Sequence, residues 1–243
     1  MTNPISSAPY YHPLETYIIP CLLFGESLTI LFTIADVIQP DCLKRFRINH
    51  RRFPTIQELQ SAMPQYIVSV IIILSLGFVG MSTMVRLDIV PYDMNPNLPP
   101  FKTSLLQFLV ISLSTELLFH ILHRYMHANR KAYQTLHFKH HRWTRDSFAL
   151  CNHDLDPIEL IIFSLCPSIP GVVMGVHYKI MFLHAILANW QGTYGHSGYS
   201  HPILTVLLFT DSIDHDTHHA RPNKNFSGGA MFSIIDRLAG TYM

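Results

Sequence analysis

The feature that most constrains this chain is a run of apolar residues without any charge. The run extends from Tyr66 to Met84 and is nineteen residues long. A helix needs about 20 residues of this kind to cross the hydrocarbon core of a membrane. A core helix of a soluble all-α protein, which is the alternative, usually keeps a polar stripe on one face, and this run has none. The sequence therefore predicts a membrane-spanning helix.

Three further segments are candidates for crossing a bilayer. The first, Tyr17 to Ile38, is interrupted by Pro20, Gly25 and Glu26, and the next, Leu105 to Leu122, contains one acid, Glu116. The last, Ile158 to Trp190, is broken by prolines, Gly171, His177 and Lys179, which favours a helical hairpin with a turn near His177. Its second arm, Ile180 to Trp190, is short for a full crossing, so a buried or re-entrant helix is the alternative.

The expected fold is therefore an all-α integral membrane helical bundle. It has about four spanning helices, of which one pair could be re-entrant, and a histidine-rich helical cap on the cytosolic side. We expect a single membrane-embedded domain over residues 1–243, with the N-terminal spans and loops in 1–104 and the histidine-rich region in 105–243. The sequence has no internal repeat that would indicate a solenoid.

Composition supports a membrane protein and excludes several other classes. Hydrophobic residues make up 49% of the chain and charged residues 14%, against about 25% charged in an ordinary soluble domain. These values exclude intrinsic disorder. A net charge of +1 provides no strong positive field, so no nucleic-acid partner is expected. The four cysteines form no CxxC pair, so neither a disulfide scaffold nor a thiolate zinc site is predicted.

The distribution of Lys and Arg predicts the orientation. Bases gather between Cys42 and Phe53 and again between Arg124 and Arg145, whereas the loop from Arg86 to Lys102 holds only its two terminal bases. Because basic loops stay on the cytosolic side, the N-terminus is expected outside. Residues 123–157 and the C-terminus are expected in the cytosol.

Histidine is the unusual residue of this chain. Fourteen of its 16 histidines fall between His120 and His219, and eight of them form three clusters: His123 and His127; His137, His140 and His141; His215, His218 and His219. Residues three or four apart share one face of a helix, so one helical face can present two or three ring nitrogens to a common point. The sequence thus predicts metal binding, and eight imidazoles indicate two ions. Imidazole suits zinc, copper, iron and nickel alike, so the clusters do not identify the metal.

At these residues the chain resembles the fatty acid hydroxylase and sterol desaturase superfamily of membrane-bound di-iron oxygenases. In that family a His-x3-His box follows a transmembrane helix, and two His-x2-His-His boxes come later, the last near the C-terminus. All three are present in that order. Further matches are Arg124, Asp156-Pro-Ile-Glu159, His196-Ser-Gly-Tyr199 and the closing stretch from Asp236 to Tyr242.

The resemblance implies two iron ions held by histidine, activation of O2, and attack on a C–H bond of a lipid, by an oxidoreductase acting on paired donors. It also implies electrons from NAD(P)H through a reductase and a b-type cytochrome, and a location in the endoplasmic reticulum. The substrate class stays open among sterols, fatty acyl chains, sphingoid bases and terpenoids, and so does the choice between hydroxylation and desaturation.

The candidate site residues follow from the clusters and the resemblance together. The catalytic or ring-orienting candidates are Glu116, Arg124 and Asp236. The metal-ligand candidates are His123, His127, His137, His140, His141, His153, His196, His215, His218 and His219. An acid inside an apolar span usually has a partner, which favours Glu116.

One position departs from the family. Where the family usually has His-Pro-x-Glu, this chain has Asp156-Pro157-Ile158-Glu159. Either His153 substitutes for the missing histidine, or Asp156 serves as a ligand or a hydrogen-bond acceptor. Asp156 could equally be the N-cap of a helix with Pro157 in its first position.

Two other functions would use the same residues. The protein could be a membrane zinc-binding or metal-transport protein without oxygenase activity, because intramembrane histidines and acids can mark an ion path. It could also be an enzyme that hydrolyses its substrate at a pair of zinc ions.

Overall fold

The computed structural model describes residues 19–48, 52–80, 83, 87, 92–144, 147–227 and 231–243. Helices form every regular element in these ranges, and only two isolated β-bridges occur there. The elements are α2 (Ser27–Ile38), α3 (Asp41–Lys44), α4 (Ile56–Ser75), η3 (Leu76–Gly80), α6 (Phe101–Ala128), α7 (Arg130–Ala132), η4 (Tyr133–His137), η5 (His140–Arg142), η6 (Ala149–His153), α8 (Pro157–Met174), α9 (Tyr178–His196), α10 (Pro202–Leu208), α11 (Ser212–Ala220) and α12 (Ile234–Leu238). The all-α expectation is confirmed.

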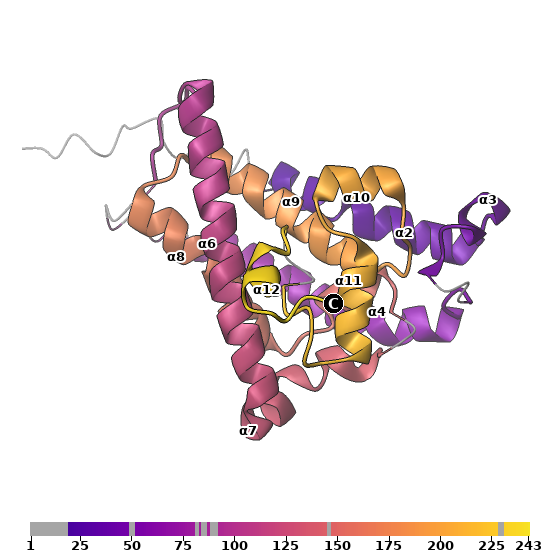
Figure 1. Cartoon of the computed structure of the whole chain (residues 1–243). Helices are drawn as coiled ribbons and strands as arrows, with labels where there is room; N and C mark the ends of the chain where they lie inside the picture. The colour runs from indigo at the N-terminus through magenta and orange to yellow at the C-terminus, as the bar shows by residue number, and fades with distance from the viewer. Residues whose placement is uncertain are drawn as a thin grey trace, which may run out of the picture.

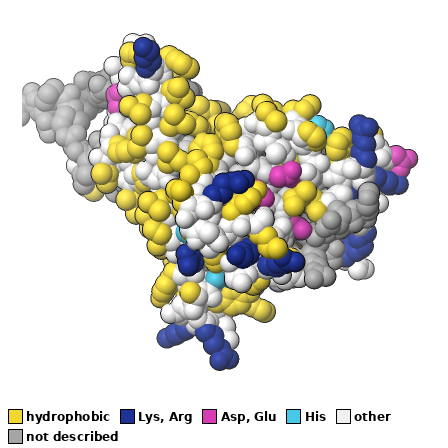
Figure 2. Space-filling view, viewed as in Figure 1, with side chains coloured by type: hydrophobic (Ala, Val, Ile, Leu, Met, Phe, Trp, Pro, Cys, Tyr) yellow, Lys and Arg dark blue, Asp and Glu magenta, His cyan; other side chains and the backbone are white. Residues whose placement is uncertain are grey.

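Four helical segments are long and apolar enough to cross a membrane. They are Ile19–Ile38, Ile56–Ser75, Phe101–Ala128 and Pro157–Met174. Their large apolar side chains are widely exposed, with Phe101 and Val173 each 79% exposed. Figure 2 shows such side chains covering much of the upper part of the molecule, around α6. This outward apolar surface is what lipid contact requires, so about four spanning helices are confirmed.

The boundaries of two spans differ from those expected. The second span begins at Ile56 rather than Tyr66, because Thr55 and Glu58 form a capping box that starts the helix in a polar stretch. The third extends from Phe101 to Ala128 rather than from Leu105 to Leu122, and it carries His123 and His127 on the same continuous helix. Residues 17, 18, 81, 82 and 84 of the expected spans lie outside the described residues.

The last apolar region is a helical hairpin, as predicted. Asp156 caps α8 and Pro157 takes its first position, which was one of the alternatives for Asp156. The helix ends at Gly175, whose φ of 59° suits glycine. His177 then caps α9 by accepting from the backbone N–H of Lys179. Hence α8 runs away from the histidine-rich end of α6, and α9 returns to it.

The first span is fixed to the end of α9. The backbone N–H of Ile48 donates to the carbonyl of Gly198 at 3.0 Å, and Arg47 pairs with Tyr199 in a β-bridge. The buried Arg47 guanidinium also lies 3.6 Å from the Asp36 carboxylate. In Figure 1 the C-terminal helices α11 and α12 lie beside α6 and α9. The segments with the histidine clusters therefore gather at one end of the bundle.

Candidate metal centre

Nine histidine side chains meet in two adjacent groups. The five-histidine group consists of His123, His127, His137, His141 and His218, and the four-histidine group of His140, His196, His215 and His219. Within each group the nearest ring nitrogens all lie within 4.8 Å of one another. The groups are neighbours, since the ring centroids of His141 and His219 are 4.6 Å apart.

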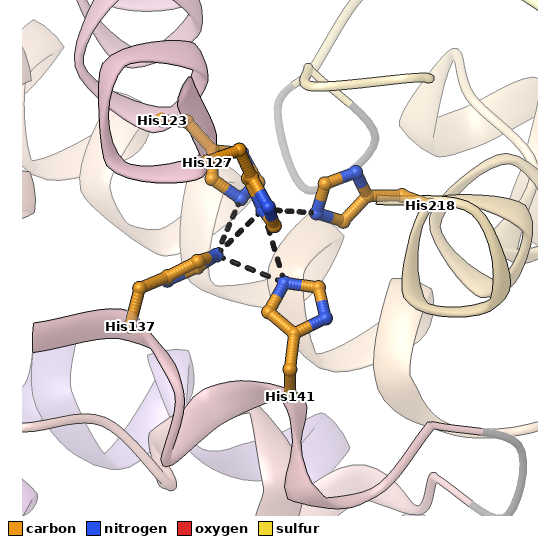
Figure 3. Close-up of side chains that lie close together, drawn as sticks. All are labelled: His123, His127, His137, His141 and His218. Atoms are coloured by element: carbon orange, nitrogen blue, oxygen red, sulfur yellow. Dashed lines mark hydrogen bonds between the residues drawn. The ribbon is translucent and has the colours of Figure 1, made fainter. Parts of the chain in front are cut away.

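The rings of the five-histidine group come from distant parts of the chain. His123 and His127 lie one turn apart on α6, His137 ends η4, His141 belongs to η5, and His218 lies on α11. Figure 3 shows these rings pointing toward a common centre. The Nε2 atom of His137 lies 3.0 Å from that of His123 and 2.9 Å from those of His127 and His141.

The second and third boxes each divide between the two groups. On α11, His215 and His219 are one turn apart and join the four-histidine group, while His218 faces the other group. The second box does the reverse, because His137 and His141 join one group and His140 the other. It also lies on a π-helical turn followed by a 3₁₀ turn, not on a regular helix. Each box thus presents two rings to one group, within the expected two or three, and the third ring of the second and third boxes faces the other group.

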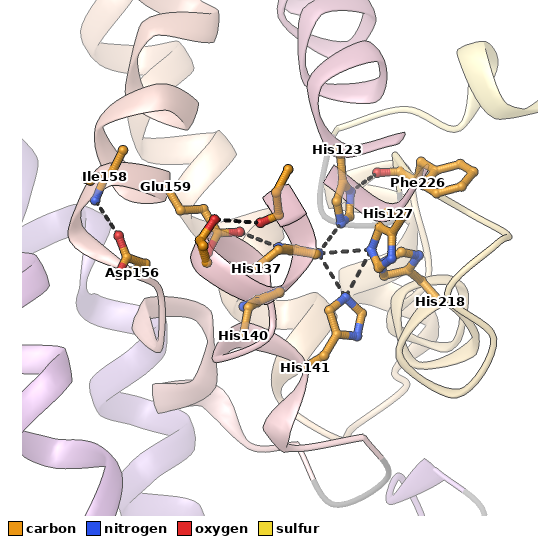
Figure 4. A network of polar contacts seen from close by, with 12 residues as sticks. His123, His127, His137, His140, His141, Asp156, Ile158, Glu159, His218 and Phe226 are labelled. Carbon is orange, nitrogen blue, oxygen red and sulfur yellow. Dashed lines mark hydrogen bonds and ion pairs between the residues drawn. The ribbon is translucent and has the colours of Figure 1, made fainter. Parts of the chain in front are cut away.

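Four of the rings donate the N–H of their Nδ1 atom to acceptors of the protein. The Nδ1 atoms of His123 and His218 donate to the carbonyls of Phe226 and Lys224, at 2.6 and 2.7 Å. That of His196 donates to the Gly192 carbonyl at 2.7 Å. The Nδ1 atom of His137 donates to the Glu159 carboxylate, as Figure 4 shows.

These bonds determine what the other ring nitrogens offer. A carbonyl or carboxylate only accepts, so each of these Nδ1 atoms carries the proton and the Nε2 of the neutral ring carries a lone pair. The Nε2 atoms of His123 and His137 are nevertheless 3.0 Å apart with no proton to share between them. Lone pairs at that separation repel each other unless a cation lies between them, and imidazoles oriented in this way bind metal ions. The donor set therefore fits a pair of metal ions.

Burial keeps the rings outside the spans neutral. It lowers the pKa of His218 to about 4 and, together with the neighbouring rings of His127 and His218, that of His137 to about 2. Burial also holds the pKa values of His140, His215 and His219 well below the usual range. Only neutral imidazole ligates a metal, so the site is in its binding-competent form at neutral pH.

Asp236 positions one of the rings without touching either group. Its buried carboxylate accepts from the backbone N–H groups of Phe226 and Ser227, at 3.0 and 2.6 Å. These bonds hold the turn whose Phe226 carbonyl accepts from His123. The hydroxyl of Thr241 donates to Asp236 at 2.6 Å, which gives the C-terminal motif a structural role.

Four other candidates lie apart from the rings. Arg124 follows His123 on α6, but its side chain is exposed. Glu116 is buried about two turns before His123 on α6, where its carboxylate accepts from the backbone N–H of Ile235 at 3.0 Å. His153 joins neither group, because its Nε2 lies 3.2 Å from Glu26 Oε1. Asp156 accepts from the backbone N–H of Ile158 at 2.9 Å, so it caps α8.

The groups that accept hydrogen bonds from the ring N–H groups were not identified from the sequence. Glu159 belongs to a motif that was recognised, and its spacing from Asp156 is the one signal that could have found it. The carbonyls of Gly192, Lys224 and Phe226 leave no trace in the sequence, since every residue type carries one.

A mostly apolar cavity of about 200 Å³ adjoins both groups. It reaches His123 of one group and His140, His196 and His215 of the other, and side chains of α4, α6, α8 and α9 line it. Its walls include Phe119, Leu160 and Phe163. The rings thus form one end of a space that suits a lipid chain.

Fold and site together describe a helical protein with four candidate membrane spans and two adjacent histidine groups that could each hold a metal ion. The model of the fatty acid hydroxylase family matches residues 108–241, which is more than half of the chain. The chain therefore belongs to the fatty acid hydroxylase family, and the resemblance inferred from the histidine boxes is confirmed.

The chain is similar to several curated proteins. It is 28% identical to the fatty acid hydroxylase domain-containing protein 2 of Macaca fascicularis, over 92% of this chain and 64% of the relative. It is 30% identical to the very-long-chain aldehyde decarbonylase GL1-9 of Oryza sativa subsp. indica, over 60% of this chain and 57% of the relative. It is also 30% identical to the sphingolipid C4-hydroxylase sur2 of Schizosaccharomyces pombe, over 50% of this chain and 42% of the relative. The chain thus spans less than two thirds of the length of each, and no solved structure matches it significantly.

Proposed function

We propose that this protein is an O2-dependent di-iron oxygenase that hydroxylates or desaturates a C–H bond of a lipid. The observation that carries the proposal is the pair of buried histidine groups, with unprotonated Nε2 atoms facing one another, at the end of an apolar cavity. The site residues we assign to the metal are the nine histidines of the two groups. His153, which lies beside Glu26, is left out of this set.

Two iron ions, when bound, would supply the activation of O2. The overall hydroxylation balances as RH + O2 + 2 e⁻ + 2 H⁺ → ROH + H2O, and desaturation uses the same electrons and protons to give the alkene and two waters. The side chains around the cavity exclude water and hold the lipid chain against the rings. Glu159 and the carbonyls of Phe226, Lys224 and Gly192 fix the tautomers, so that the ligating nitrogens stay aligned.

The substrate is proposed as a lipid on the basis of the cavity and of the relatives. Proteins similar to this chain are named as a fatty acid hydroxylase, a sphingolipid hydroxylase and a cholesterol 25-hydroxylase-like protein, which supports a fatty acyl, sphingoid or sterol substrate alike. An aldehyde decarbonylase is also named, so an aldehyde at the same site is the second reaction to test.

The proposed reaction needs a source of electrons, and the metal site must face one side of the membrane. We propose NAD(P)H, a reductase and a b-type cytochrome as the donor chain, with the site on the cytosolic face of the endoplasmic reticulum. Basic residues support this side, since Arg130 and Lys131 form α7 directly after the histidine-bearing end of α6.

Metal binding without oxygenase activity is the alternative. Eight of the nine rings are buried and the ninth is half-buried. The cavity beside them is mostly apolar. An ion path needs polar groups along its length, so these features favour a lipid substrate.

The test is lipid mass spectrometry of cells that express the protein under ¹⁸O2, compared with cells that express a His140→Ala variant. We expect a lipid with one ¹⁸O atom, or with one further double bond, that the variant does not produce. Equal products from both would overturn the proposal. Activity restored to the metal-free protein by zinc and not by iron would favour hydrolysis at a zinc pair.

A further inference from the structure

The helix α10 lies outside the four candidate spans, yet apolar side chains on it point away from the protein. Ile203, Val206 and Leu207 are 63%, 74% and 62% exposed, and Phe209, directly after the helix, is 57% exposed. Residues three and four apart share one face of a helix, so the first three form a single apolar stripe. We call these four side chains the α10 face.

The polar contacts of α10 are directed into the protein instead. The hydroxyls of Thr205 and Tyr194 lie 2.9 Å apart, and the Thr205 hydroxyl donates to the carbonyl of His201 at 3.1 Å. The Tyr194 hydroxyl accepts from the backbone N–H of His201 at 2.8 Å. A surface helix in water turns its apolar side inward and its polar side outward. In α10 this pattern is reversed, which indicates that the α10 face meets an apolar phase.

The start of α10 lies beside the segment that follows the first span. The backbone N–H of Ser200 donates to the Phe46 carbonyl at 2.8 Å, and the ring centroids of Phe46 and His201 are 4.3 Å apart. Phe46 comes only eight residues after Ile38, where the first span ends. Figure 2 shows apolar side chains continuing from the region of α6 along the upper edge of the molecule to that of α10. The α10 face thus continues the surface that the spans offer to lipid.

Two basic residues flank this junction. Lys44 ends α3 and Arg45 follows it, and both side chains are exposed. The Arg45 guanidinium lies over the Phe46 ring, 4.7 Å from its centroid. Bases beside an apolar surface suit the anionic headgroups of a membrane. The α10 face and these bases together match the two layers of a membrane surface, its acyl chains and its headgroups.

We propose that the α10 face inserts into lipid on the side of the membrane where the histidine groups lie, so that α10 is an interfacial helix. Its seven residues are about 10 Å long, which is too short to cross the membrane, so α10 lies in the membrane surface. It joins α9, which carries His196, to α11, which carries His215, and the contact therefore holds both ring-bearing helices to the membrane. This contact does not depend on the proposed reaction.

The experiment measures what surrounds a label on α10. The full chain, with the accessible Cys21 and Cys42 replaced by Ser, carries a bimane label at Leu207→Cys in nanodiscs of phosphatidylcholine and phosphatidylserine. Quenching by phosphatidylcholine with brominated acyl chains is compared with quenching by iodide in the water. The matched controls are Leu106→Cys on α6, where the parent side chain is also 62% exposed, and Lys131→Cys, at an exposed position of α7.

We expect brominated lipid to quench the Leu207 label as strongly as the Leu106 label, and iodide to quench chiefly the Lys131 label. Iodide quenching of the Leu207 label to the level of Lys131 would overturn the inference, because the α10 face would then meet water. A Leu207 label that neither quencher reaches would overturn it too, because a second copy of the chain would then cover the face. So would a Leu106 label quenched by iodide alone, since α6 would then not lie in lipid.

A second pair of variants tests whether the apolar side chains hold α10 in the lipid. The label is moved to Ile203→Cys, and Leu207 is replaced by Asp or, as the matched control, by Phe. A charge is costly to bury in lipid, so Leu207→Asp should reduce quenching by brominated lipid about twofold or more relative to Leu207→Phe. Equal quenching in the two variants would overturn the inference. The proposed oxygenase activity is measured separately under ¹⁸O2, so either idea can fail alone.

Discussion

The carboxylate of Glu159 should control how tightly the five-histidine group holds its ion. It is fully buried and accepts the Nδ1–H of His137. Removing a group that orients a ligating histidine typically costs 10–100-fold in metal affinity, or about 1.4–2.8 kcal/mol. Glu159→Gln keeps an acceptor without the charge, so we expect about tenfold. Glu159→Leu leaves the His137 N–H unpaired in a buried site, so we expect about a hundredfold.

The control for this series lies in the same helical turn. Asp156→Asn also removes one negative charge, but Asn is as good an N-cap as Asp. Among the described residues, the Asp156 side chain bonds only the start of α8. Iron is withdrawn anaerobically with increasing chelator, and the metal left per chain is measured. We expect Glu159→Leu, and to a smaller extent Glu159→Gln, to lose one ion at lower chelator than Asp156→Asn. Identical midpoints for all three variants would refute the assigned role.

Three further predictions test other parts of the structure. Acid should unfold the metal-free protein: the pKa of His218 is lowered to about 4 by burial, so below pH 6.5 the unfolded chain binds more protons, and stability falls between about pH 6.5 and pH 4. A melting temperature that is constant over that window would contradict it. The His153→Ala variant should keep both ions in a metal analysis, because the His153 ring pairs with Glu26 outside both groups. Loss of an ion would instead identify His153 as a metal ligand. Gly198→Ala should lose about 1–3 kcal/mol in thermal unfolding, because Gly198 has φ of 74° and a Cβ would lie 2.9 Å from Arg47. Gly77→Ala, whose Cβ meets nothing within 4 Å, is its control, and equal stability of the two would refute the reasoning.

The spanning helices and the grouping of histidine rings could be predicted from the sequence, because both depend on local patterns. An uncharged apolar run specifies a spanning helix, and the clusters specify ring nitrogens near its end. The start of α4 was missed, since its polar first turns carry no apolar signal and only the capping box of Thr55 and Glu58 defines it.

The division of the boxes could not be predicted from spacing. Whether His140 faces the same way as His137 depends on a π-helical turn followed by a 3₁₀ turn, and a regular helical period does not describe either. The role of Asp236 depends on a turn around Phe226 that only the folded chain brings beside His123. Contacts between distant segments therefore determine the part of the site that local sequence patterns could not predict.

The proposed pair of metal sites is tested most directly by the number of ions that the two histidine groups hold. Metal content per chain should be measured on the purified protein and on two variants that each remove a ring from one group only, His127→Ala and His196→Ala. We predict two ions in the parent chain and a reduced content in each variant, with the ion of the mutated group released first by chelator. A parent chain that binds at most one ion, or two variants that both keep two ions as tightly as the parent, would contradict it.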